Sequence, residues 1–575
     1  MIAPGAATAA PSRFRQSCAT LGRSADAVAR HVVLALAVIL LIQVGVTVAL
    51  FFSINHNGWL TYQGGDQLWL VTSGWLLGKG AVGYALTSHG WPMLVAPLTW
   101  ITGSSSVQLL PLTTILQVGV LAPIATLAVY DIGARLAGRL AGLWCACAFV
   151  AAPFLAIPYF VQRYHDSWVD QFLPQALGLT QQADFPSVVA VLVSAAFTVR
   201  ALKAAAYREA LLAGTFAGVA LALKPANALY LGGPALAFLL ARRWSHAAIF
   251  AAALGPALLA LTIWKAKGLD QVPLFAQEEL RLAAGAADPV IGSVTSWFDR
   301  TVNLDLDVWK QNMSNLREFT WSARVLQWLP LAGALAVARR SLPAAGLLLA
   351  WLLGYVVVKG AAEVATVESG SYWRLIMPAL PAFVLLSAAV PLLVPTAMRR
   401  LGPRIAPLPA RGPGWRTTIA VVAVTGLLPL VWLTAAGVSY VQQRPDGVYV
   451  ADEVIVSEIG VPADADVIDL SVVGTSTGNA LRWTDSTSRA RTFYRVYRAS
   501  NSKGFTDLIC ETGLVQECHL RAETLVTTRE QHYLDPDPPA DAIYRVGVAA
   551  NWLDDESEGD VFAISPPVVP SPAAP

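Results

Sequence analysis

Asp66 is the residue whose type and position point most directly to chemistry. It lies in Tyr62-Gln63-Gly64-Gly65-Asp66-Gln67-Leu68-Trp69 and is the only acid between Asp26 and Asp131. A carboxylate that closely follows the first long apolar segment, among glycines and aromatic residues, could act as a general base and remove a proton from an attacking hydroxyl. The alternative is structural, because Asp commonly caps a turn in a Gly-Gly loop.

Two basic residues lie where a phosphate could be bound. Lys224 ends an otherwise apolar segment, and Arg374 stands just before another. A charge at a membrane boundary is costly unless it is paired or lines a cavity, so both residues are candidates for binding a phosphate. The alternatives are that Lys224 extends its ammonium to the membrane surface, and that Arg374 pairs with Glu363 or Glu368.

Four further residues are weaker candidates for a substrate or metal site. His165 and Asp166 are adjacent in a polar segment and could bind a metal or a phosphate, although such residues more often only solvate a loop. Asp184 precedes Phe-Pro and is most simply the first residue of a helix. His89 precedes Gly-Trp-Pro. No group of Cys and His residues has the spacing of a zinc site.

The composition indicates the environment in which these residues act. The chain has 575 residues, of which 55% are apolar and 14% charged, and its mean hydropathy is +0.52. A soluble protein carries about 25% charged residues. Repeated apolar segments of roughly 20 residues therefore predict a polytopic α-helical membrane protein, with membrane lipids and not nucleic acid around it.

We expect about eleven spans in residues 31–440. Basic residues follow every second span, and by the positive-inside rule these ends are cytoplasmic. The N-terminal residues 1–30 are then a cytoplasmic tail, which we expect to be disordered. The outer loops are 54–108, 162–184 and 265–322, and an apolar stretch at 91–101 is too short to span and is interpreted as re-entrant or interfacial. The predicted spans are 31–53, 109–130, 140–160, 185–201, 210–223, 247–264, 372–394 and 417–440, with three more that end near Arg242, Arg339 and Lys359.

The C-terminal part has a different composition. From residue 441 onward the net charge is −11, whereas residues 1–440 carry +13. Short alternating segments separated by polar turns predict β-strands. The segments around Trp483, Phe493-Tyr-Arg-Val-Tyr and Tyr544 resemble a fibronectin type III β-sandwich, here 464–567, in which Trp483 and Tyr544 would be core residues. Residues 441–463 would be a linker and 568–575 a disordered tail.

The same domain contains two cysteines, Cys510 and Cys518. They are eight residues apart and could close a small loop if the domain lies in an oxidising compartment. We therefore treat them as a disulfide candidate.

Three segments in order along the chain carry a second resemblance. They are Asp66-Gln67 with the Gly/Pro-rich segment Ser88–Leu98, then Gly214–Pro225, then Tyr372-Trp-Arg-Leu-Ile-Met-Pro-Ala-Leu-Pro381. This order resembles the GT-C superfamily of polytopic glycosyltransferases, which includes dolichyl-phosphate-mannose-protein mannosyltransferases and aminoarabinose transferases. That family usually has Asp-Glu where this chain has Asp66-Gln67, which removes one acid that could bind a metal.

The resemblance implies a glycosyltransferase that moves a sugar from a polyprenyl-phosphate donor to an envelope glycan, lipid or protein. Transfer would occur on the outer face of a bacterial-type plasma membrane, with Asp66 as the base and Lys224 and Arg374 at the donor phosphate. A divalent metal is left open. The alternative is a non-enzymatic transporter or envelope-assembly protein that carries a binding domain; transporters often contain internal repeats, and no clear repeat is seen.

Overall fold

The computed structural model describes the helical part of the chain and most of the predicted β domain. Several predictions lie outside the described residues, among them the tail 1–30, Asp166, and the acids Glu363 and Glu368; the backbone of Asp66 is described but its side chain is not. The described residues are 31–53, 65–83, 85, 87–103, 106–159, 161–165, 168–204, 206–269, 305–361, 367, 371–394, 413–438, 441–443, 449–451, 454–457, 468–485, 492–500, 508–510, 518–520, 523–550 and 560–572.

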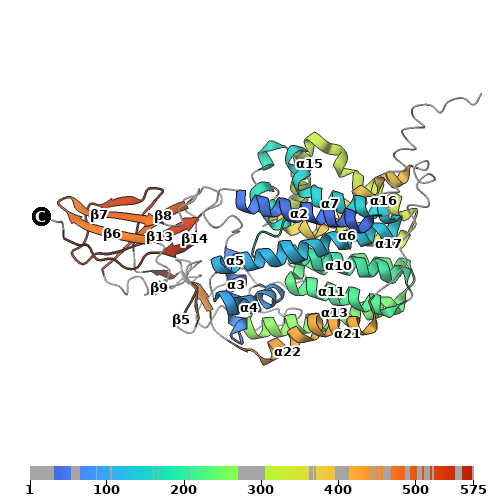
Figure 1. The fold of residues 1–575 in the computed structure, drawn as a ribbon, viewed down its shortest axis with the longest axis horizontal. Coiled ribbons are helices and arrows are strands. Elements are labelled where there is room, and N and C mark those ends of the chain that lie inside the picture. The colour runs from blue at the N-terminus through green and yellow to red at the C-terminus, as the bar shows by residue number, and fades with distance from the viewer. Residues whose placement is uncertain are drawn as a thin grey trace, which may run out of the picture.

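The helices form an elongated bundle (Figure 1). Two of the described helix starts have a side-chain cap: Asp305 accepts hydrogen bonds from Asp307 N and Val308 N at 2.8 and 3.0 Å, and Ser341 Oγ accepts one from Ala344 N at 3.3 Å. Such caps satisfy backbone donors that a helix start leaves open. The main helices are α2 Val32–Ser53, α3 Gly65–Gly78, α4 Gly90–Thr102, α5 Ser106–Thr114, α6 Ala122–Ala137, α7 Arg139–Tyr159, α9 Leu173–Ala176, α10 Asp184–Lys203, α11 Tyr207–Leu223, α12 Gly232–Leu240, α13 Trp244–Leu269, α15 Leu306–Phe319, α16 Leu329–Ala338, α17 Leu342–Gly360, α18 Ser371–Ile376, α19 Leu380–Ala388, α21 Trp415–Val422 and α22 Leu428–Ala435.

Short irregular turns of helix connect several of these elements. The wide turns η1 and η9 continue α5 into α6 and α21 into α22, so that each pair forms one long apolar rod. The short turns are η1 Ile115–Leu121, η2 Gln162–Tyr164, η3 Trp168–Phe172, η4 Pro225–Leu231, η5 Trp321–Gln327, η6 Met377–Ala379, η7 Val390–Leu393 and η9 Ala423–Leu427.

Seven helical segments in the described part are long and apolar enough to cross a membrane. They are Val32–Phe51, Leu109–Ala137, Asp184–Lys203, Trp244–Gly268, Leu342–Gly360, Tyr372–Leu393 and Trp415–Ala435, and each coincides with a predicted span. Three of the other four predicted spans fall on helices of 17 residues or fewer. The fourth, 140–160, falls on α7, whose apolar part is Arg139–Leu155. The chain is therefore a polytopic helical membrane protein, and the count of eleven stays a prediction.

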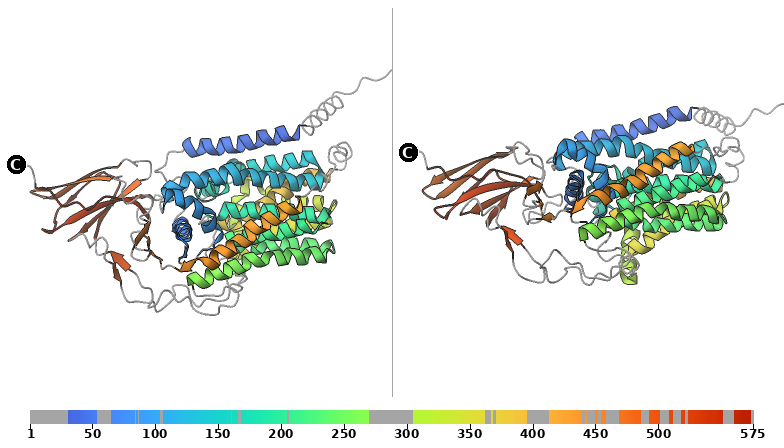
Figure 2. Two further views of the ribbon diagram at one scale, coloured as in Figure 1. Left: turned by 60° about the horizontal axis from the view of Figure 1, so that its bottom comes forward. Right: turned by 90° about the horizontal axis from the view of Figure 1, so that it is seen from below.

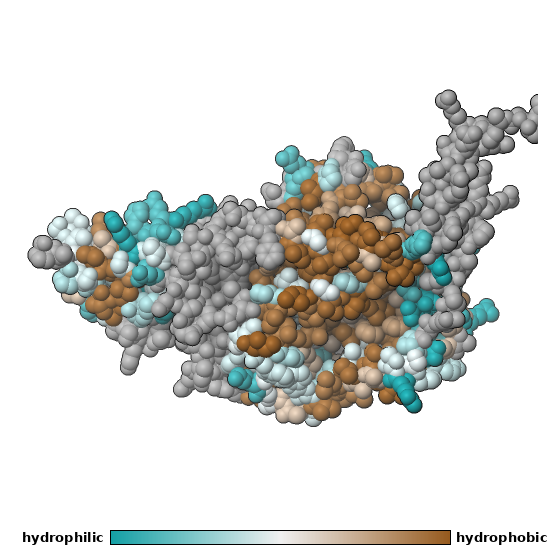
Figure 3. Space-filling view, viewed as in Figure 1, coloured by the Kyte–Doolittle hydropathy of each residue, from teal (hydrophilic) through white to brown (hydrophobic). Residues whose placement is uncertain are grey.

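The surface of the bundle agrees with this class. Figure 3 shows a broad apolar band over the helices, with hydrophilic residues gathered at the end away from the strands. Large apolar side chains such as Leu41, Ile115 and Leu335 are more than 60% exposed. In water such a surface would be unfavourable, whereas hydrocarbon chains solvate it well.

The predicted outer loop 54–108 contains ordered helices. Helix α4 covers the apolar stretch 91–101, and its Trp91 is fully buried. It packs on α3 at Gly74, where an added Cβ would lie 3.1 Å from Pro92 O and overlap Val95. One side of the stretch is therefore packed on the protein, whereas Trp100 and Ile101 are 66% and 77% exposed, and its interpretation as re-entrant or interfacial stays a prediction.

The C-terminal strands form two larger antiparallel sheets, one of four strands in the order β11-β8-β13-β14 and one of three in the order β12-β7-β6. Trp483 and Tyr544 are both buried, as expected. Between the sheets, Asn479 Nδ2 donates to Tyr544 Oη at 3.0 Å, and Tyr544 Oη donates to Asp535 at 2.6 Å. These features fit a small antiparallel sandwich, and its assignment as fibronectin type III stays a prediction. The strands are β6 Ile468–Thr475, β7 Gly478–Asp485, β8 Thr492–Ala499, β11 Glu523–Thr528, β12 His532–Asp535, β13 Ile543–Ala550 and β14 Asp560–Ile564.

The limits of this domain differ from the predicted ones. The predicted linker 441–463 holds a three-stranded sheet, β3 Val441–Gln443, β4 Tyr449–Ala451 and β5 Val454–Ser457. At the other end, the predicted disordered tail 568–575 contains Val568 and Ser571, whose backbones bond to Tyr544 and Val472 at 2.9–3.0 Å. These bonds satisfy strand-edge groups, so the paired chain continues past residue 567.

The two cysteines of the domain lie opposite one another. β9 Leu508–Cys510 and β10 Cys518–Leu520 pair antiparallel, and the register joins Cys510 to Cys518. Residues directly opposite in such a pair have Cα atoms about 4.5–5.5 Å apart, within the range of a disulfide. The disulfide itself stays a prediction.

Close helix contacts in the bundle depend on small residues. Gly214 on α11 faces Phe250 O on α13, and Gly218 faces Ala257 on the same partner, so that an added Cβ at Gly214 would overlap the Phe250 carbonyl. The Gly-xxx-Gly pattern at 214–218 therefore allows α11 to pack closely on α13.

We predict that Gly214→Ala destabilises the protein by about 1–3 kcal/mol, because the new methyl group has to displace backbone. Gly255→Ala on α13 is the matched control, since nothing lies within 4 Å of a Cβ at that position. Thermal unfolding of the purified variants in detergent measures both effects. Equal stability of the two variants would contradict the contact.

Candidate functional site

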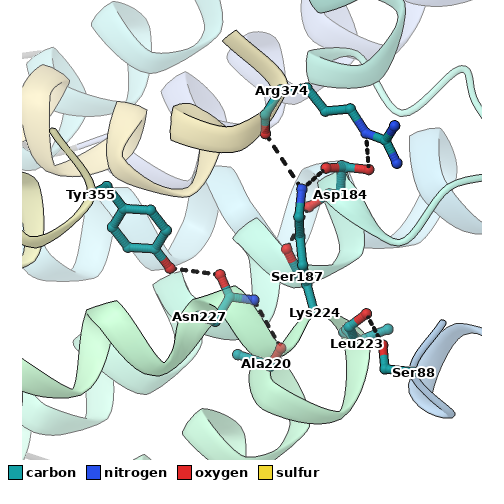
Figure 4. Close-up of polar contacts among 9 residues, drawn as sticks. All are labelled: Ser88, Asp184, Ser187, Ala220, Leu223, Lys224, Asn227, Tyr355 and Arg374. Carbon is teal, nitrogen blue, oxygen red and sulfur yellow. Dashed lines mark hydrogen bonds and ion pairs between the residues drawn. The ribbon is translucent and has the colours of Figure 1, made fainter. Parts of the chain in front are cut away.

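Three of the predicted site residues meet at the carboxylate of Asp184. Lys224 Nζ donates to Asp184 Oδ1, and Arg374 Nε donates to Asp184 Oδ2 at 3.2 Å. Lys224 Nζ also lies 3.5 Å from the backbone carbonyl of Arg374. Figure 4 shows the carboxylate between the two cations. We call Asp184, Lys224 and Arg374 the ion cluster.

The ion cluster joins three elements that are far apart in sequence. Asp184 is the first residue of α10. Lys224 follows the last residue of α11, where an extended backbone (φ −150°) turns the chain into η4 at Pro225. Arg374 lies in the short helix α18. Proline removes a backbone donor and disfavours helix at the residue before it, which explains why α11 stops at this point.

The carboxylate is more deeply buried than its partners. The Asp184 side chain is 3% exposed, against 16% for Lys224 and 28% for Arg374. A buried carboxylate is costly unless it is paired and hydrogen-bonded. The two cations meet that requirement, and their partial exposure leaves a side from which a ligand can approach them.

Hydrogen bonds around the end of α11 hold Lys224 in place. Ser88 Oγ donates to Leu223 O at 2.6 Å, and Asn227 Nδ2 donates to Ala220 O at 2.8 Å. Tyr355 Oη on α17 in turn donates to Asn227 Oδ1 at 2.6 Å. Gly90 packs directly on this helix end, since an added Cβ would lie 2.6 Å from the carbonyl carbon of Ala222. The position of Lys224 is therefore determined by α4 and α17 as well as by its own chain.

Aromatic residues support the helix that carries Arg374. The Trp373 ring lies 5.2 Å from that of Trp168 and 4.2 Å from that of Phe319, and Trp168 also stacks near Phe172 at 4.0 Å. All four are buried. Their packing connects α18 to η3 and α15, so the backbone next to Arg374 is held from two sides.

A third cation, not among the predicted site residues, lies on the helix that carries Tyr355. Lys359 is in the last turn of α17, one helical turn after Tyr355. Lys359 ends an apolar segment, which is the signal that singled out Lys224. The same reasoning could therefore have found it.

Asp66 is the second residue of α3. Its neighbour Gln67 is buried, and Gln67 Oε1 accepts a hydrogen bond from Gln181 N at 2.6 Å. This bond places the first turn of α3 against the segment that leads into Asp184. The role of Gln67 was not predicted from the sequence, where it stood out only as a departure from Asp-Glu.

His89 is fully packed inside the protein. It is 1% exposed, directly before α4, and its ring lies 6.4 Å from that of Trp264. Burial, together with the charge of Lys265, lowers the pKa of His89 to about 3. The imidazole is therefore neutral at physiological pH, and it cannot serve as a cationic phosphate ligand.

Of the two residues predicted as possible metal ligands, one lies in the described part of the chain. His165 follows η2 and is half-buried, while Asp166 lies outside that part, so the pair stays a prediction. Among the described residues, no three or more His, Cys, Asp or Glu side chains are grouped so as to hold a metal ion. The ion cluster does not fit one either, because its carboxylate is occupied by two cations that would repel a divalent ion.

The bundle contains an apolar cavity of about 450 Å³, whose lining includes sequence neighbours of two ion-cluster residues. Phe185, next to Asp184, and Met377, one turn after Arg374, both line it. Its remaining walls come from α2, α7, α10, α19 and the end of α9, including Val46, Thr47 and Leu380. The site therefore combines charged groups at helix ends with a neighbouring space suited to hydrocarbon.

Comparisons with known proteins give matches at the level of structure alone. No protein-family model matches the chain, and no curated protein matches its sequence. The structure is similar to ArnT from Cupriavidus metallidurans bound to undecaprenyl phosphate, with 13% identity over 70% of this chain and 76% of that one, at a TM-score of 0.40. It is also similar to the Archaeoglobus fulgidus oligosaccharyltransferase in complex with zinc and sulfate (14% identity, 69% and 53% covered, TM-score 0.39) and tethered to an acceptor peptide (13%, 70% and 55%, 0.37).

We predict that Asp184→Asn lowers stability by about 3–5 kcal/mol, because it leaves two partly buried cations without their carboxylate. Adding Lys224→Met should restore part of the loss, since one unpaired charge is then gone. Thermal unfolding of the two single variants and the double variant in detergent measures this coupling. Additive effects would show that the pair is not energetically linked.

Proposed function

We propose that the chain is a membrane glycosyltransferase that takes a sugar from a polyprenyl-phosphate donor. The observation that carries the proposal is the ion cluster beside the apolar cavity. A lipid-linked phosphate has an anionic head, which suits the cations of the ion cluster, and a long hydrocarbon chain, which suits the apolar cavity. The overall similarity to ArnT and the oligosaccharyltransferase concerns the fold, and the proposal rests on the site.

In this proposal Lys224 and Arg374 bind the donor phosphate. Guanidinium and ammonium groups form charge-assisted hydrogen bonds with phosphate oxygens. Figure 4 draws the terminal nitrogens of Arg374 on the side away from Lys224, and this side chain is the most exposed of the three. Asp184 positions both cations and need not contact the ligand. The cavity receives the isoprenoid chain, with the units nearest the phosphate at Phe185 and Met377 and later units toward α2.

Asp66 is the proposed base. Transfer to a hydroxyl requires removal of its proton while the anomeric carbon develops positive charge. The Gln67–Gln181 bond sets the first turn of α3 beside the segment before Asp184, which supports a base near the phosphate. No metal is required in this scheme, because the cations neutralise the leaving group.

The location of the site favours transfer over transport. The ion cluster lies where α10 begins and α11 ends, whereas transporter sites lie near the membrane midplane, often at broken helices. The same end of the bundle carries the strands in both views of Figure 2. We infer that this end is extracytoplasmic and that the C-terminal domain faces the envelope acceptor, which is a glycan, lipid or protein.

We predict that Asp66→Asn lowers the rate of sugar transfer by about 10²–10⁴-fold, the usual contribution of a general base. Transfer is measured in membranes supplied with radiolabelled polyprenyl-phosphate sugars. Asp307→Asn is the control, because that carboxylate is 91% exposed and pairs only with Lys310 among the contacts described for it. Full activity of the Asp66 variant would exclude it as the base.

A second prediction concerns the cavity. Val46→Trp should weaken binding of undecaprenyl phosphate several-fold and leave farnesyl phosphate unaffected, because the indole occupies space that only the longer chain needs. Val46 lines the cavity and is 42% exposed, so the larger side chain can be tolerated. Leu41→Trp, on an exposed part of α2 that does not line the cavity, is the control. Equal losses for both lipids would contradict the assignment.

A further inference from the structure

A polar pocket lies on the three-stranded sheet of the C-terminal domain. Its volume is about 440 Å³, which is in the size range of small-ligand sites, about 300–1,000 Å³. The residues that line it are the buried Trp483 and six exposed polar residues, Asp469, Ser471, Arg482, Thr484, Gln531 and His532. The proposed function assigns no role to this pocket.

Strand pairing brings the polar side chains together in two rows. Arg482 on β7 lies directly between Ser471 on β6 and His532 on β12. In the next row, Asp469 lies opposite Thr484. Directly opposite residues point to the same face of a sheet, with Cβ atoms about 4.5–5.5 Å apart. The residues that alternate with them along β6 and β7 are buried, so both rows lie on the face turned away from the core.

Several groups of the pocket are already fixed by contacts within the domain. Ser471 Oγ donates to Arg482 O at 3.2 Å, and Gln531 Nε2 donates to Tyr494 Oη at 3.0 Å. The Trp483 ring packs 5.5 Å from that of Tyr494, which holds β7 in place beneath the pocket. The oxygens of Ser471 and Gln531 keep the capacity to accept hydrogen bonds from a ligand. A ligand therefore loses little free energy in ordering these groups.

The lining distinguishes between the three acceptor classes, glycan, lipid and protein. A lipid or a protein partner needs exposed apolar or aromatic groups at the centre of its site, whereas Trp483, the one apolar residue of the described lining, is 3% exposed. An anion is not favoured, because Asp469 lies one row from Arg482, and Glu530 lies 3.1 Å from His532. A neutral sugar fits this lining, since neighbouring hydroxyls match the two oxygens of a carboxylate and the fork of a guanidinium.

The pocket lies in the half of the sheet that is nearer the helices. Ser571 O accepts a hydrogen bond from Gly474 N, near the end of β6, at 2.9 Å, and Figure 1 shows the C-terminus at the end of the domain furthest from the bundle. Asp469 and Thr484 lie at the opposite ends of their strands. A polymeric acceptor has to be held on this side of the domain for its end to approach the bundle.

We propose that this pocket binds the acceptor, that the acceptor is a neutral glycan, and that Asp469 and Arg482 are its main hydrogen-bonding residues. The inference rests on the proposed function for the role of the glycan as acceptor, whereas binding itself is independent of it. The pocket acts on acceptor binding and not on the chemical step. Its loss should therefore raise KM for the glycan and leave kcat nearly unchanged.

The test measures binding of four linear hexasaccharides, built from glucose, mannose, galactose or arabinose, to the purified full-length chain by titration calorimetry. The detergent must carry no sugar headgroup. We expect the wild type to bind at least one of the four. Arg482→Ala and Asp469→Ala should each weaken that binding by about tenfold or more, the scale of one hydrogen bond to a charged group. Both side chains are exposed, so the variants should fold.

Arg495→Ala is the matched control, because Arg495 lies on β8 in the other sheet and does not line the pocket. Binding of undecaprenyl phosphate should be unchanged in all three variants, which also shows that they are folded. A wild type that binds no hexasaccharide overturns the glycan assignment. Binding that survives both pocket substitutions overturns the pocket as the site. Hexasaccharide binding that is lost in both pocket variants, in a chain that transfers no sugar from a lipid-linked donor, overturns the proposed function and supports the pocket.

Discussion

The arrangement of the site depends on one carboxylate held between two cations. Asp184 joins the start of α10 to the end of α11 and to α18 through Lys224 and Arg374. Without Asp184 the two cations would repel each other in surroundings of low dielectric, and without the cations the carboxylate could not remain 3% exposed. The three helix ends are therefore mutually dependent, although about 190 residues separate the first from the last.

Much of the architecture followed from hydropathy and charge. An apolar segment of about 20 residues in lipid has to form a helix, because only there do its backbone N–H and C=O groups all find hydrogen-bond partners. The seven long helices were predicted for this reason. Lys224 and Arg374 were singled out from the sequence because a charge next to an apolar segment is costly unless it has a partner.

The partner itself could not be predicted. Asp184 was interpreted most simply as a helix-start residue, which it is, and nothing in its local sequence shows that α11 and α18 end beside it. The bonds from Ser88 to Leu223 and from Tyr355 to Asn227 depend equally on how helices pack. Periodicity identifies a buried face but not the residue that it meets. His89 illustrates the limit, because its sequence context resembles that of a ligand and only the packing shows a neutral, enclosed ring.

The two-residue pairing of β1 (Ala81–Val82) with β2 (Gly437–Val438) has a mechanical consequence. Gly437 N donates to Gly80 O at 2.7 Å, and Lys267 bonds to the last carbonyls of α22. The chain that leads to the β-sandwich thus leaves the bundle from an anchored point beside α3. Any movement of the sandwich relative to the bundle therefore has to begin after residue 438. The point of attachment itself stays next to α3, the helix that carries Asp66.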